Sequence, residues 1–308
     1  MKTKTINRIL IGKFKNWQKS IQDESLQKLV EGNTIITGGC IASFLLDEKV
    51  NDFDLYFRTK DVTKAVARYY VAKFNEENNA AAFNGSTRTV GQADVREENG
   101  RVKIVVKSAG VASSTQDEGY EYFEMNEDSF NQEEFIKGAT AVLKASQSAK
   151  KGEYKPVFLT SNAVSLSSSV QIIIRFFGEP DAIHSNYDFI HCTNYWTSWE
   201  NKVTLRKAAL ESLLTKELRY VGSKYPMTSV IRTRKFIRRG WTINAGQYLK
   251  MLVQLGDLDL HNVKVLEDQL VGVDVAYFLD LIDRVKNGVE QGKQVDSAYI
   301  CELVDEIF

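Results

Sequence analysis

Two glycines and two aspartates near the start of the chain have the types and spacing of a phosphate and metal site. Gly38 and Gly39 stand side by side, and Asp52 and Asp54 follow with one residue between them. Paired glycines let the backbone turn tightly and let a ligand approach the bare main chain. Neighbouring carboxylates repel each other unless a cation neutralises them, and Mg²⁺ commonly shares such oxygen ligands with substrate phosphates. The pattern therefore predicts a magnesium site that holds the phosphates of a nucleotide.

The chemistry that such a site would support is transfer of a nucleotidyl group. Two magnesium ions about 3.5–4 Å apart, with Mn²⁺ as the alternative ion, would activate an attacking hydroxyl and stabilise a pyrophosphate leaving group. Each half of the pattern also has a simpler interpretation. A glycine pair often marks only a turn, and an Asp-x-Asp pair on a strand edge is often solvated charge. The order and spacing of the two pairs together favour the functional interpretation.

Two short elements must position these residues. Side chains alternate along a strand at residues 53–57, so Asp52 and Asp54 point to one face while their apolar neighbours point into the core. A helix over residues 41–48 would begin just after the glycines, where its unpaired N–H groups and the positive end of its dipole suit a phosphate. On that helix, Ser43 would approach the triphosphate.

The chain divides near residue 200 into a part with strands and a helical part. Strands are predicted at residues 34–37, 53–57, 102–107, 120–125, 157–159 and 170–177. Further helices are predicted at residues 1–17, 62–76, 132–146, 199–218, 228–239, 245–255, 262–270, 273–286 and 298–307. The predicted fold is an α+β head, residues 1–198 with an insertion at about 60–157, followed by an all-helical region, residues 199–308.

Composition limits the class of protein. The 308 residues hold 40 basic and 40 acidic side chains, which argues against a protein that coats nucleic acid with uniform positive charge. Three scattered cysteines form neither a zinc pattern nor a disulfide framework, and they fit a reducing cytoplasm. No apolar run approaches the roughly 20 residues that span a bilayer. We therefore expect a cytoplasmic protein without a membrane anchor.

Three segments carry a resemblance to a known family. The first is Gly-Gly-Cys-Ile-Ala-Ser-Phe-Leu-Leu followed by Asp-Phe-Asp-Leu, and the second runs through residues 159–166 into residues 172–178. The third is the basic helix of residues 231–243. Together they resemble the polymerase-β-like nucleotidyltransferase superfamily, and more narrowly the head and neck of bacterial tRNA CCA-adding enzymes and poly(A) polymerases. The resemblance implies a mixed-sheet head with flanking helices, an NTP substrate and an RNA 3′ end, such as that of tRNA, as acceptor.

The sequence departs from that family at three places. An Arg-Asp pair of the first helix is replaced by Ala42 and Ser43, and the family's Arg-Arg-Asp is absent at residues 156–158. The family's nucleotide-selecting template falls on residues without its hydrogen-bonding groups, namely Tyr225, Pro226 and Ser229. These losses keep the metal and phosphate chemistry but remove the grounds for CCA addition. A divergent, phage-like nucleotidyltransferase fits this pattern.

A third carboxylate often completes the metal site in this superfamily. Asp188 stands between aromatic residues in a strand-like run, and Glu124 has a similar setting and competes for the role. An edge-strand charge is the alternative for either residue. His184 and His191, which flank Asp188, are candidates for phosphate contact or acid–base chemistry, with a structural role as the alternative.

Two further sets of polar residues could bind the nucleotide. Thr160 and Asn162 follow a predicted strand and could hold a ribose hydroxyl, although a turn or cap would use the same side chains. Arg232 and Lys235 share a face of the basic helix and could grip the triphosphate or an RNA end, with a solvated surface as the alternative.

Two hypotheses follow for the function. The first is an enzyme that transfers a nucleoside monophosphate from an NTP to a hydroxyl acceptor, an RNA 3′ end being favoured, with release of pyrophosphate. In this enzyme Asp52, Asp54 and Asp188 would hold the metal. The second is a non-catalytic nucleotide- or RNA-binding protein that retains the fold.

Overall fold

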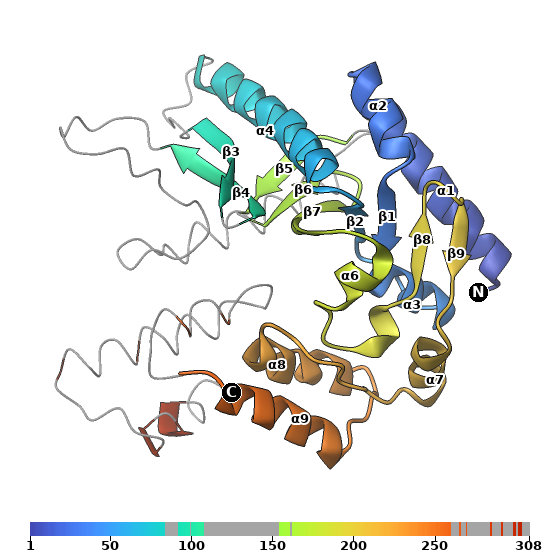
Figure 1. The fold of residues 1–308 in the computed structure, drawn as a ribbon, viewed down its shortest axis with the longest axis vertical. Coiled ribbons are helices and arrows are strands. Elements are labelled where there is room, and N and C mark those ends of the chain that lie inside the picture. The colour runs from blue at the N-terminus through green and yellow to red at the C-terminus, as the bar shows by residue number, and fades with distance from the viewer. Residues whose placement is uncertain are drawn as a thin grey trace. The chain divides into compact units, whose positions relative to one another are not determined.

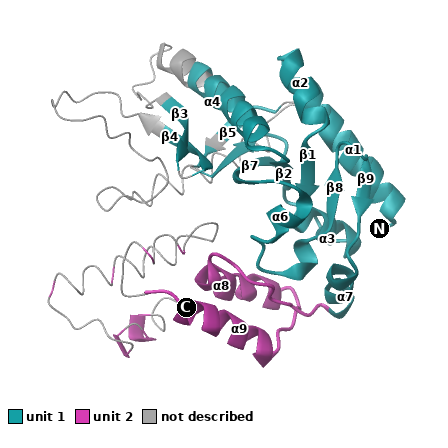
Figure 2. Cartoon of the chain, in the orientation of Figure 1, with its two compact units in different colours: residues 1–215 teal, residues 216–308 magenta. Residues whose placement is uncertain are grey.

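The computed structural model divides the chain into two compact units, Met1–Thr215 and Lys216–Phe308 (Figure 2). It describes residues 1–83, 92–98, 100–107, 154–160 and 162–259, and a few single positions beyond. The sequence-based division at residue 198 differs from the structural one by strand β9 (Lys202–Thr204) and helix α7 (Lys207–Thr215), which both belong to the first unit.

A seven-stranded sheet forms the centre of the first unit, in the order β5-β6-β7-β2-β1-β8-β9 (Figure 1). The other strands are β1 (Thr34–Thr37), β2 (Phe53–Phe57), β5 (Pro156–Leu159), β6 (Ala163–Leu166), β7 (Val170–Phe177) and β8 (Tyr195–Thr197). Strands β2 and β7 run parallel, and every other neighbouring pair runs antiparallel. The sheet is therefore mixed, and the predicted α+β class is confirmed.

Helices and a small second sheet accompany this sheet. The helices of the first unit, besides α7, are α1 (Thr3–Ser20), α2 (Glu24–Glu31), α3 (Gly39–Leu45), α4 (Lys60–Phe83) and α6 (Pro180–His184), with a 3₁₀ turn η1 (Ile190–Cys192). Strands β3 (Gln92–Glu98) and β4 (Arg101–Lys107) form an antiparallel pair. The second unit contains α8 (Pro226–Ile237) and α9 (Ala245–Gly256).

The main hydrophobic core lies on one face of the large sheet. Helix α1 contributes its buried stripe, Ile6, Leu10, Phe14 and Trp17, at the three- and four-residue spacing of one helix face. The helix predicted at residues 1–17 is therefore confirmed, and it is amphipathic. Helix α4 packs with it, and the indole of Trp17 donates a hydrogen bond of 2.8 Å to the hydroxyl of Tyr70.

The opposite face of the sheet carries a smaller apolar cluster. Ile35, Tyr56 and Ile183 form its buried part, with Tyr187 and other partly buried aromatic rings against them. Because side chains alternate along β2, Asp54 shares a face with Tyr56 and not with the buried Leu55. The predicted placement of the Asp-x-Asp pair away from the main core therefore agrees with the strand register.

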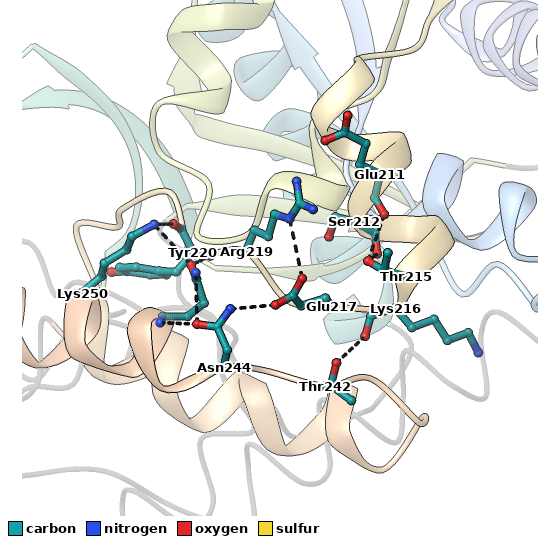
Figure 3. A network of polar contacts seen from close by, with 11 residues as sticks. Glu211, Ser212, Thr215, Lys216, Glu217, Arg219, Tyr220, Thr242, Asn244 and Lys250 are labelled. Carbon is teal, nitrogen blue, oxygen red and sulfur yellow. Dashed lines mark hydrogen bonds and ion pairs between the residues drawn. The ribbon is translucent and has the colours of Figure 1, made fainter.

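Hydrogen bonds hold the start of the second unit together. Asn244 donates to Glu217 at 2.7 Å, while its own side-chain oxygen caps the first turn of α9 (Figure 3). Glu217 also lies 3.9 Å from the guanidinium of Arg219, and the carbonyl of Lys216 accepts from the Thr242 amide at 2.8 Å. These contacts fix the extended segment that enters this unit.

Most predicted elements within the described residues are confirmed, with small shifts of their ends. The helix predicted over residues 199–218 is wrong in its first part, where β9 pairs with β8 and places Val203 opposite the buried Trp196. Packing of that hairpin prevails over a local helical pattern. The predictions at residues 120–125 and 132–146, and Glu124, lie outside the described residues. The helices predicted at residues 262–270, 273–286 and 298–307 lie mostly outside them. Among the described helices, none is long and apolar enough to cross a membrane.

Candidate metal and nucleotide site

The glycine turn lies directly against the second aspartate. Strand β1 pairs antiparallel with β2 so that Thr37 is opposite Asp54. Gly38 follows with a φ of 91°, a conformation that favours glycine, and a Cβ added to it would lie 2.8 Å from Asp54 Oδ2. The Gly38 amide donates to the Cys192 carbonyl at 3.2 Å. Because Gly38 has no side chain, the Asp54 carboxylate can lie close to the backbone of the turn.

Gly39 has open space where its neighbour does not. A Cβ added to Gly39 would meet no atom within 4 Å, and α3 begins at this residue. Ser43 lies on the same short helix, is partly buried, and its carbonyl accepts from the Glu48 amide at 2.8 Å. A ligand therefore has room to approach the main chain at Gly39.

The charge of Asp52 perturbs the carboxyl group of Asp54. Asp52 is exposed just before β2, whereas Asp54 is more enclosed. Burial, and then the charge of Asp52, raises the pKa of Asp54 to about 8. The pKa of the Cys40 thiol is also raised, mainly by burial and to a lesser extent by the charges of Asp54 and Asp52. A divalent cation would favour the ionised form of both acids, and carboxylate oxygens are ligands that Mg²⁺ accepts, so the residues present fit this ion.

Asp188 does not join these acids in a group. Among the described residues there is no cluster of three or more His, Cys, Asp or Glu side chains able to hold a metal. Asp188 is buried and its carboxylate accepts from the Phe189 amide at 3.0 Å. The strand register instead places Gln171 of β7 beside Asp54. The role of Asp188 as a third ligand stays a prediction, and a cation at the pair would draw further ligands from phosphate oxygens.

Thr160 and Asn162 lie in the turn between β5 and β6. The hydroxyl of Thr160 accepts from the Ala163 amide at 2.9 Å, and the side-chain oxygen of Asn162 accepts from Arg175 at 3.3 Å. In the register of β6 and β7, Ala163 is opposite Ile173, two residues beyond the partner of Asp54. Both side chains therefore stabilise the turn, which was the alternative role offered for them. Their contact with a ribose stays a prediction.

Arg232 and Lys235 lie on α8 in the second unit. Lys235 is exposed and Arg232 is partly buried. Tyr225, Pro226 and Ser229, where the family has its nucleotide-selecting template, are buried at the start of this helix. The Ser229 hydroxyl donates to the Tyr225 carbonyl at 3.2 Å. These residues therefore support the helix end, and binding by the two basic residues stays a prediction.

His184 and Tyr187 lie beside the glycine turn. Thr37 donates to the Asn194 carbonyl at 2.9 Å, so the His184 Nε2 at 2.8 Å must be the donor to the Thr37 hydroxyl. Burial, and then the charge of Arg206, lowers the pKa of His184 to about 4, which keeps the ring neutral. The ring of Tyr187 packs edge-on against His184, with centroids 5.1 Å apart.

Sequence reasoning missed Tyr187 because an aromatic residue before an acid looks like ordinary core. Its hydroxyl lies 3.5 Å from the position that a Cβ on Gly38 would take. Only the turn after α6, where the Tyr187 amide donates to the His184 carbonyl, brings it to the site. No pattern in the sequence signals that approach.

Fold and site together define an α+β protein with a carboxylate pair at a glycine turn of a mixed sheet. The sequence profile described as the Gabija anti-defense 2 family protein matches residues 9–216. The chain belongs to the Gabija anti-defense 2 family. The matched residues nearly coincide with the first unit and include the whole carboxylate and glycine site.

A curated relative carries the same name. Gabija anti-defense 2 of Bacillus phage SPbetaL7 is 22% identical over 103 residues, which are 33% of this chain and 26% of that protein. The match thus spans about a quarter of the relative's length.

Solved structures of tRNA-processing enzymes show a distant likeness. The Bacillus stearothermophilus CCA-adding enzyme in complex with CTP aligns with 87% of this chain at 12% identity and a TM-score of 0.34. The Thermotoga maritima CCA-adding enzyme complexed with tRNA aligns with 95% at 10% identity and a TM-score of 0.36. The alignments cover 51% and 65% of those chains, between half and two thirds of their length.

Proposed function

We propose that this protein is a divalent-metal-dependent nucleotidyltransferase that transfers a nucleoside monophosphate from an NTP to a hydroxyl acceptor and releases pyrophosphate. The observation that carries this proposal is the 2.8 Å between Asp54 Oδ2 and the position of a Cβ on Gly38. Asp54 of the acidic pair thus lies against the bare glycine backbone, an arrangement that supports a site sharing cations with a triphosphate.

The chain's own residues would act mainly by position and charge. Asp52 and Asp54 would hold Mg²⁺ or Mn²⁺, which would neutralise charge on the attacking and leaving oxygens. The open space at Gly39 would admit the triphosphate against the main chain, with Ser43 nearby on α3. Fixed carboxylates and backbone groups require no rearrangement as charge develops, which is the largest source of such rate enhancement.

The acceptor that we propose is an RNA 3′ end, in line with the resemblance of the first and third segments. The loss of the template at Tyr225, Pro226 and Ser229, which are buried at the start of α8, removes the basis for CCA selection. Because the chain belongs to the Gabija anti-defense 2 family, we propose that the transfer acts against the Gabija defence.

The test is transfer of label from each α-³²P-labelled NTP, with Mg²⁺, to total RNA or to soluble protein from cells that carry the Gabija defence. Wild-type protein should label one of these fractions, and Asp54→Asn should label neither. Label in RNA supports the proposed acceptor, whereas label in protein would replace it with a protein hydroxyl. Equal labelling by Asp54→Asn would refute the role of the carboxylate pair.

A second candidate is a binder that blocks the defence without catalysis. The replacement of the family's Arg-Asp pair by the buried Ala42 and the partly buried Ser43 favours it. Phage plating on cells with the Gabija defence separates the candidates. A catalytic protein should lose its protective effect in Asp54→Asn, and a binder should keep it.

A further inference from the structure

Tyr187 places a hydroxyl at the centre of the candidate site. The oxygen is 3.5 Å from the position of a Cβ on Gly38, and Asp54 Oδ2 is 2.8 Å from that same point. The ring is held from two sides, 5.1 Å from the ring of His184 and 6.2 Å from that of Tyr56. Packing against two rings fixes the direction in which the hydroxyl points.

This hydroxyl is buried and makes no hydrogen bond with any described residue. The hydroxyls of Tyr56 and Thr37 are its polar neighbours, and neither forms a well-aligned hydrogen bond with it. A tyrosine hydroxyl has an ordinary pKa of about 10, so it carries a proton to donate at neutral pH. An unsatisfied buried hydroxyl is costly, and such groups occur where a ligand completes them.

We propose that Tyr187 is a substrate-contacting residue whose hydroxyl donates a hydrogen bond to a phosphate oxygen of the NTP held at Asp54. This inference rests on the proposed function and adds to it a residue that the sequence does not reveal. A phosphate oxygen is the fitting acceptor because a neutral phenol beside a carboxylate can donate but carries no charge to repel the anion. The donor also lies on the side of the glycine turn where β1 and β2 bring the carboxylate.

Tyr187→Phe tests the inference, because it removes one oxygen and keeps the ring packing. The matched control is Tyr70→Phe, which removes a hydroxyl that accepts from Trp17 at 2.8 Å in the core on the opposite face of the sheet. The measurements are the melting temperature without ligand and the Kd of a non-hydrolysable NTP analogue with Mg²⁺ by titration calorimetry.

Tyr187→Phe should keep or raise the melting temperature and weaken nucleotide binding by about tenfold, the effect of one hydrogen bond to a charged group. Tyr70→Phe should lower the melting temperature and leave the Kd unchanged. An unchanged Kd in Tyr187→Phe overturns the inference. Asp54→Asn is run beside them. If it binds and turns over NTP normally, the proposed function fails, whereas a wild-type Kd in Tyr187→Phe alone removes only this inference.

Discussion

At the scale of the residue, the two adjacent glycines have different surroundings. Gly38 has a positive φ and Asp54 Oδ2 beside it, whereas Gly39 has no atom near the position of a Cβ. Gly38 is therefore required by the fold. Gly39 is not, and its missing side chain leaves room for a ligand to approach the main chain. The types and order of the residues in the sequence predicted the pair but could not separate these two roles.

Gly38→Ala should destabilise the protein by about 1–3 kcal/mol, because the backbone is strained and the new methyl group meets the carboxylate. Gly39→Ala is the matched control and should change the free energy of unfolding by less than about 0.5 kcal/mol, while weakening NTP binding. Urea unfolding and nucleotide titration of both variants provide the check. Wild-type stability in Gly38→Ala would contradict the geometry of the turn.

His184 gives a pH dependence whose sign follows from its pKa of about 4, below the ordinary value of 6.5. Between these values the unfolded state binds more protons, so the free energy of unfolding falls as pH drops from 6.5 to 4. The full loss amounts to about 3 kcal/mol.

The comparison is urea unfolding of wild type and His184→Gln at pH 7.0 and 4.5. The variant should lose less stability between the two pH values. The raised pKa of Asp54 acts in the opposite direction in both proteins and cancels in the comparison. Equal losses in the two proteins would show that His184 does not titrate as expected.

At the scale of the element, β2 is anchored from its core side. Lys13 of α1 lies 4.6 Å above the ring of Phe53, which separates the two acids, and donates to the Ser168 carbonyl. The Phe53 amide donates to the Ser169 carbonyl at 2.9 Å, and both serines have a positive φ, at 65° and 55°. Helix α1 therefore anchors the turn at Ser168 and Ser169, and this turn anchors the start of β2.

Lys13→Met should lower NTP turnover about tenfold, because small displacements of catalytic groups have large effects on rate. Its free energy of unfolding should change by less than about 1 kcal/mol, because loss of the hydrogen bond is offset by removal of a partly buried charge. Lys15→Met, on the exposed side of α1, is the control. Full turnover in Lys13→Met would show that the turn does not position the acids.

Sequence patterns predicted β1, β2 and β7 because β-branched and aromatic runs are local signals. They also predicted that Asp52 and Asp54 share a face, since alternation is a property of any strand. Pairing between β2 and β7 joins residues more than a hundred positions apart, so nothing local could place Gln171 beside Asp54. The hairpin of β8 and β9 was mistaken for helix because tertiary packing decides it.

At the scale of the whole molecule, the family match and the first unit nearly coincide. The profile covers residues 9–216 and the first unit covers residues 1–215. Gly38, Asp52, Asp54 and Tyr187 all lie within both, whereas the basic residues of α8 lie outside both. The family match therefore covers the part of the chain that carries the candidate site.

The most direct test of this account is Mg²⁺-dependent release of pyrophosphate from the four NTPs, compared between wild type and Asp54→Asn. Asp47→Asn, in the exposed turn after α3, is the control for loss of a carboxylate outside the site. We expect release by the wild type and by Asp47→Asn, and a loss of at least about a hundredfold in Asp54→Asn. Equal release by Asp54→Asn and wild type would contradict the claim that the carboxylate pair carries the chemistry.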